Sequence, residues 1–99
     1  MAKLDLLKTW TKTPRERMDY DVSFREWLAK EGDTPAAVNP LSVTVETGIT
    51  LESFTFVAGV AKVWVSGGVA GGAYRVTLQL TTSGGRIKES EFEIAVREK

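Results

Sequence analysis

The chain has 99 residues, the usual size of one domain with one hydrophobic core. Its 13 Lys and Arg residues balance 13 Asp and Glu residues, so it lacks the basic excess typical of a nucleic-acid-binding protein. It contains no Cys and no His, which excludes disulfides, thiol nucleophiles, the Ser-His-Asp triad and zinc sites built on thiolate or imidazole. We therefore expect a domain that needs no metal and no cofactor, whose melting temperature EDTA leaves unchanged.

Residues 1–19 form a polar, mixed segment without the periodicity of a helix or a strand. This pattern predicts a loose N-terminal arm, or an arm that becomes ordered on a partner with Trp10 as its anchor. Because Leu4, Leu6 and Leu7 add apolar area to the arm, we favour ordering on a partner. On this hypothesis, deleting residues 1–12 leaves the domain folded and abolishes assembly. The apolar runs are too short for a membrane span, and the first residues lack a signal-peptide core, so we expect no membrane partner.

From residue 20 onward, apolar and polar residues alternate in short runs, which is typical of half-buried strands. Tyr20–Phe24 is the first such run, and Arg25–Glu31 favours a short helical turn around Trp27 that Gly32 ends. The phase of the third run shifts near Ser53, which predicts a β-bulge. The later runs are Leu41–Glu46, Ile49–Phe56, Ala61–Ser66, Tyr74–Thr81 and Glu91–Arg97.

These six strands, or seven if the arm pairs, predict an all-β, antiparallel sandwich or small barrel over residues 20–99. Regular alternation argues against a parallel α/β sheet, whose strands are continuously apolar. The core is expected to contain seven inward-facing residues: Phe56, Val65, Tyr74, Val76, Leu78, Phe92 and Ile94.

The glycine-rich segment Gly67–Gly72 is interpreted as a structural loop, because a phosphate-binding glycine loop is followed by a helix and here a strand follows. Tyr74 opens that strand. In immunoglobulin-like sandwiches a Tyr at this corner often hydrogen-bonds back to the backbone, so we expect Tyr74 to be a structural corner residue or an ordinary core residue.

Trp64 is expected to point outward, because Val63 and Val65 point into the core. An outward tryptophan indicates an interface or a site that the arm or a loop covers, and both alternatives stay open. The acidic residues near the helical turn lack calcium-loop spacing and are interleaved with basic residues, so we interpret them as solvated surface. The sequence thus predicts no catalytic, cofactor-binding or metal-binding residue, and Trp10 and Trp64 are the candidate interface residues.

Two blocks of the sequence resemble one family. The first is Tyr20–Leu28 followed by Gly32-Asp33-Thr34, with Thr11–Pro14 as its lead-in, and the second comprises Val63–Gly68, Gly72–Thr77 and Thr81–Arg86. Together they resemble a family of small prophage-encoded structural proteins of tailed phages. The chain departs from the family at Phe24, where the family often has Trp.

The resemblance implies an immunoglobulin-like fold and the role of a fibre–tail adaptor or head–tail region protein. It further implies a place in the virion, assembled in the host cytoplasm, with other virion proteins or further copies of the chain as partners. The alternative is a carbohydrate- or cell-surface-binding module that stacks Trp10 and Trp64 on sugar rings. An enzyme is not expected, because without His or Cys it would need carboxylates or Lys in a pocket.

Overall fold

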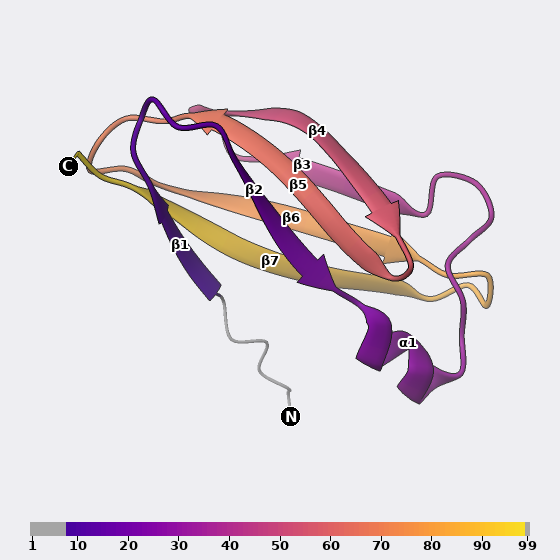
Figure 1. The fold of residues 1–99 in the computed structure, drawn as a ribbon. Coiled ribbons are helices and arrows are strands. Elements are labelled where there is room, and N and C mark those ends of the chain that lie inside the picture. Colours follow the sequence, from indigo (N-terminus) through magenta and orange to yellow (C-terminus); the bar gives the residue numbers. More distant parts are fainter. Residues whose placement is uncertain (1–7, 99) are drawn as a thin grey trace.

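A computed structural model describes residues 8–98, which form seven strands and one short helix (Figure 1). The elements in chain order are β1 Lys8–Lys12, β2 Met18–Ser23, α1 Arg25–Glu31, β3 Leu41–Val45, β4 Ile49–Val57, β5 Val60–Gly67, β6 Ala73–Thr81 and β7 Ile87–Val96. Among these residues, no helix is long and apolar enough to cross a membrane. The predicted all-β class and the helical turn around Trp27 are confirmed.

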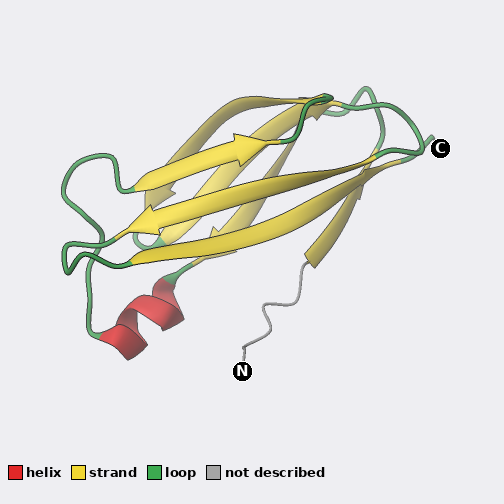
Figure 2. Cartoon of the chain, turned by 180° about the vertical axis from the view of Figure 1, so that it is seen from behind, coloured by secondary structure: helices red, strands yellow, loops and turns green. Residues whose placement is uncertain are grey.

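The strands form a four-stranded sheet in the order β1-β7-β6-β3 and a three-stranded sheet in the order β2-β5-β4. Figure 2 shows the two layers, with α1 at one end of the strands. Every pair is antiparallel except β1 and β7, which run parallel with Trp10 opposite Ile94. This arrangement leaves β1 and β2 as edge strands on one side of the sandwich, and β3 and β4 on the other.

The predicted loose arm is wrong for residues 8–12, which form β1. Trp10 packs against the core, and the Lys12 side chain is 2% exposed. The Lys12 ammonium donates to the carbonyl oxygens of Gly67 and Thr13 at 2.6 and 2.7 Å, and burial lowers its pKa although Glu16 acts in the opposite direction. These contacts hold β1 in place, so the predicted seventh strand exists. Leu4, Leu6 and Leu7 lie outside the described residues.

The core lies between the sheets and consists of the inward faces of their strands. Five of the seven predicted core residues are at most 2% exposed: Val65, Val76, Leu78, Phe92 and Ile94. The prediction is wrong for Phe56 and Tyr74, which are only partly buried. Phe56 lies on the edge strand β4 and Tyr74 near the start of β6, so each has neighbours on fewer sides.

Local backbone signals in the sequence place the turns correctly. The β4–β5 register shifts between Leu51 and Ser53, which confirms the predicted bulge. Helix α1 ends at Gly32, whose φ of 65° is left-handed and therefore favours glycine. Residues 68–72 form a loop before β6, and Gly67 of the predicted loop is instead the last residue of β5, paired with Ile49. The turn between β6 and β7 contains Ser83-Gly84-Gly85.

Candidate interaction surfaces

Tyr74 braces the glycine-rich loop that precedes its own strand. Its hydroxyl accepts a hydrogen bond from the backbone N–H of Val69 at 3.0 Å. A Cβ added to Gly72 would lie 2.7 Å from that hydroxyl, so the close approach requires glycine there. The Tyr74 hydroxyl therefore has a hydrogen-bond partner within the fold, and its role is structural.

Trp64 projects from the outer face of the three-stranded sheet, since Val63 and Val65 beside it are fully buried on the inner face. It lies between Asp19 of β2 and Ser53 of β4 in the strand register. The Arg17 guanidinium lies 4.5 Å from the centroid of the indole ring, a cation–π distance. Trp64 is thus partly covered by a residue of the predicted arm and partly open to solvent.

Charged side chains border Trp64 on the same outer face. The Lys62 ammonium lies 2.9 Å from carboxylate oxygens of both Asp19 and Asp21. The hydrogen bond from Lys62 lowers the pKa of Asp19, and the two carboxylates raise the pKa of Lys62. Exposed pairs of this kind add little stability. We call Trp64 with Arg17, Lys62, Asp19 and Asp21 the outer tryptophan face.

Trp10 occupies a different place. Its ring centroid lies 5.1 Å from that of the core residue Tyr20, which in turn lies 5.6 Å from Phe92. Burial, with smaller contributions from nearby carboxylates, raises the pKa of Tyr20 to about 12. Trp10 therefore fills the gap between the edge strands β1 and β2, on the core side of the sheet from which Trp64 projects outward. The structure does not bring the two predicted interface residues onto one surface.

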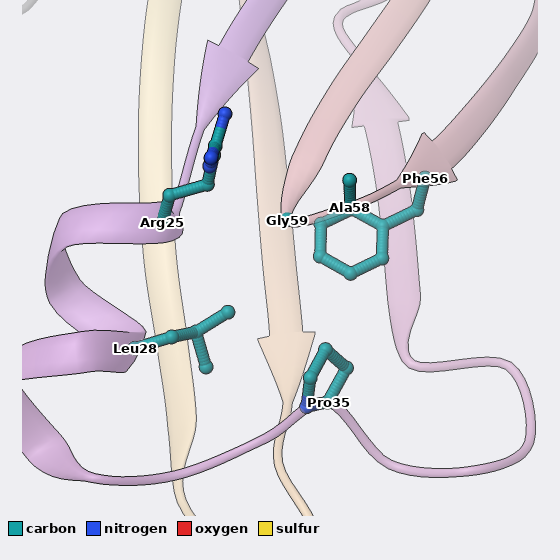
Figure 3. A pocket seen from close by; sticks show the side chains of 6 residues that line it. All are labelled: Arg25, Leu28, Pro35, Phe56, Ala58 and Gly59. Carbon is teal, nitrogen blue, oxygen red and sulfur yellow. The ribbon is translucent and has the colours of Figure 1, made fainter.

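Two cavities lie on the β3–β4 side and beside α1, and no sequence pattern predicted either of them. One of about 530 Å³ is lined by Arg25, Leu28, Pro35, Phe56, Ala58 and Gly59. In Figure 3, Leu28 and Pro35 extend toward the Phe56 ring. The other, of about 580 Å³, lies between residues 39–43 and 54–56. Of the residues lining the first cavity in the described chain, Arg25 alone is ionisable, and no group of metal-ligating side chains occurs among residues 8–98.

Asp33 joins the end of α1 to the turn between β6 and β7. One carboxylate oxygen accepts from the Arg86 guanidinium at 2.7 Å, and the other accepts from the N–H groups of Thr34 at 2.8 Å and Gly84 at 3.2 Å and from the Ser83 hydroxyl at 3.3 Å. The side chain is 6% exposed. Hydrogen bonds, the most effective of them from the Thr82 side chain, hold the pKa of Asp33 well below its ordinary value of 3.8. The two sequence blocks that carry the family resemblance meet at this network.

Replacing Asp33 by Asn is expected to lower the melting temperature at pH 7, because the ion pair with Arg86 is lost. A depressed pKa in the folded state stabilises the fold above the unfolded value and loses that effect as pH falls. The difference between Asp33→Asn and the unsubstituted chain should therefore shrink below about pH 3.8. Glu31→Gln is the matched control, since Glu31 contacts Arg86 at 3.5 Å from a more exposed position. Equal melting temperatures at pH 7 for Asp33→Asn and the unsubstituted chain would contradict the role of this network.

A family model described as "Podophage GP4 fiber-tail adaptor protein gp77" matches residues 12–95. The chain belongs to this family. The predicted resemblance to tailed-phage structural proteins is confirmed, and membership places the chain among phage structural adaptors. The match to the adaptor family spans β2 through most of β7, including the Asp33 network and the outer tryptophan face, and begins at the last residue of β1.

The fold is similar to that of a solved structure. The crystal structure of the cysteine protease inhibitor EhICP2 from Entamoeba histolytica superposes with a TM-score of 0.54 at 10% identity, over 91% of this chain and 85% of that one. At this identity the likeness concerns the fold alone. No curated protein sequence matches the chain.

Proposed function

We propose that this protein connects a tail fibre to the tail of a phage particle through protein–protein contacts, without catalysis. The observation that carries the proposal is the adaptor-family match over residues 12–95, whose description names that role. The chemistry of the described surface agrees with it, because aromatic and aliphatic side chains lie on open faces bordered by charges, as in protein interfaces. On this proposal the protein is part of the virion, and it joins the particle during assembly in the host cytoplasm.

The outer tryptophan face is the surface that we propose for contact with another virion protein. Trp64 offers a large apolar ring that is partly open, and tryptophan and arginine are the residue types enriched at interface hot spots. The interface role of Trp10 stays a prediction, and it concerns the part of the ring that Tyr20 leaves uncovered. Because the two tryptophans do not line one concave surface, the carbohydrate-binding alternative has lost its main support.

We also propose that the sandwich is of the immunoglobulin type. The orders β2-β5-β4 and β3-β6-β7 match the B-E-D and C-F-G strands of that fold. Tyr74 near the start of the F-equivalent β6, with its hydroxyl bonded to the Val69 backbone, resembles a tyrosine corner. The first strand departs from the constant-type arrangement by pairing with β7.

Complementation tests the proposed contact. In a phage that lacks this gene, the unsubstituted protein supplied in trans should restore fibres, and Trp64→Ala should reduce the fibre content of purified particles at least tenfold. Gln79→Ala, exposed on the outer face of the other sheet, is the control and should restore fibres fully. Melting curves confirm that both variants fold. Normal fibre content with a folded Trp64→Ala protein would show that the contact lies elsewhere, and normal fibre content without the protein would refute the adaptor role.

A further inference from the structure

The strand β4 has a free edge. It pairs with β5 on one side and, among residues 8–98, with no strand on the other. Alternate N–H and C=O groups of such an edge strand point away from the sheet and can pair with a further strand. The bulge at Leu51–Ser53 interrupts the strand, so the regular part of the free edge is residues 53–57.

This edge lacks the charges that usually protect edge strands. Residues 53–57 read Ser-Phe-Thr-Phe-Val and carry no charge and no proline. On the opposite side of the sandwich, the edge strand β2 carries Asp19 and Asp21, and β1 carries Lys8 and Lys12. Charged side chains on an edge discourage pairing with another chain. The contrast between the two sides points to pairing on the β4 side.

The core is also open beside β4. Phe54 lies opposite Val63, a fully buried residue, so its side chain is on the core-facing side of the sheet, yet it is 38% exposed. The cavity of about 580 Å³ between β3 and β4 adjoins it and is lined by Phe54, Phe56 and Val43. A strand added to β4 would place its own core-facing side chains over this opening. Free backbone groups and uncovered aromatic area therefore occur at one place.

We propose that β4 pairs with β4 of a second copy of this chain, antiparallel about a two-fold axis that passes through Thr55. In this register Thr55 lies opposite its symmetry mate, Ser53 lies opposite Val57, and Phe54 of each copy lies opposite Phe56 of the other. Directly opposed residues share a face, so the four phenylalanines meet on the core-facing side and close both openings. The two three-stranded sheets become one six-stranded sheet.

The distribution of charge favours a second copy of this chain as the partner of β4. Self-pairing of β4 places no like charges opposite each other, and the formal net charge of zero adds no long-range repulsion. Self-pairing of β2 about Tyr20 would instead place Asp19 opposite Asp21 in both halves. The other uncharged edge, β3, has five residues and presents no exposed large aromatic side chain. The pairing is independent of the adaptor role, because it is tested by the oligomeric state of the isolated chain and not by the fibre content of particles.

Light scattering coupled to size-exclusion chromatography, on the full chain at about 10–100 µM, tests the proposal. The unsubstituted chain should elute as a dimer. Thr55→Asp and Thr55→Lys, each at an exposed position, should each be monomeric, because like charges then face each other on the axis. An equimolar mixture of the two variants should regain the dimer, since the charges become opposite. Thr44→Asp, exposed on β3 and outside the lining of the cavity, is the matched control and should stay dimeric.

A monomeric unsubstituted chain overturns the proposal, whether or not it binds another virion protein through β4. A dimer that withstands Thr55→Asp overturns it too, and so does a dimer that Thr44→Asp dissociates as completely as Thr55→Asp does. Circular dichroism of each variant establishes that it is folded. Loss of the dimer in both single variants and its recovery in the mixture support the pairing and its register, and no result of this experiment bears on fibre attachment.

Discussion

Replacing Leu78 by Ala is expected to lower the free energy of unfolding by about 2–5 kcal/mol, the usual cost of truncating a core leucine and leaving a cavity. Leu78 is 0% exposed and lies in the middle of β6, between β3 and β7. Its strand partners Val43 and Ser90 are fixed by pairing on both sides, so the surrounding backbone has little freedom to collapse into the space. Urea denaturation followed by circular dichroism measures the effect.

Gln79→Ala is the control for this substitution, because Gln79 is exposed on the next position of the same strand. It should change the free energy of unfolding by less than about 0.5 kcal/mol, as surface substitutions usually do. A cost for Leu78→Ala near that of Gln79→Ala would mean that the inward face of β6 is assigned incorrectly.

Deleting residues 1–12 is expected to destabilise the domain severely, contrary to the expectation that the sequence alone supports. The deletion removes β1, exposes the edge of β7, and removes the aromatic contact between Trp10 and Tyr20. Trp10 is partly buried, and the deletion also removes the buried Lys12 and the pairing of β1 with β7. We expect these losses together to cost about 3 kcal/mol, similar to the truncation of a buried aromatic residue, and a loss of that size lowers the melting temperature by roughly 12–24 °C in a domain of this size. Differential scanning calorimetry measures the shift.

Thr9→Ala is the matched control on β1, since Thr9 is exposed and its backbone pairing persists. It should leave the melting temperature nearly unchanged. If the truncated chain melts cooperatively at the temperature of the full chain, β1 contributes nothing to the core. The prediction of a loose N-terminal arm would then be correct.

Local patterns made most of the sandwich predictable. The alternation from Leu41 to Val96 indicated the strands and their inward faces, because side chains of a strand alternate between the two faces of a sheet. The phase shift at Ser53 and the glycine after α1 likewise depend on the local backbone alone. Such features need no knowledge of which strands are neighbours.

The parts that the sequence did not reveal depend on contacts between distant residues. β1 is a strand because it pairs with β7, more than 80 residues away, and its five residues are too few to display a clear period. The Asp33–Arg86 ion pair joins residues 53 positions apart. Phe56 has the pattern of a core residue but is only partly buried, because β4 is an edge strand and edge position follows from sheet order.

We propose that this protein is a structural part of the phage particle and links the fibre to the tail. The most direct test is quantitative mass spectrometry of extensively washed particles from the phage that encodes it, with and without the gene. We predict a fixed ratio of this chain to the fibre protein in complete particles, and loss of the fibre protein from particles that lack the chain. Abundant chain in the lysate but none in washed, fibre-bearing particles would contradict the claim.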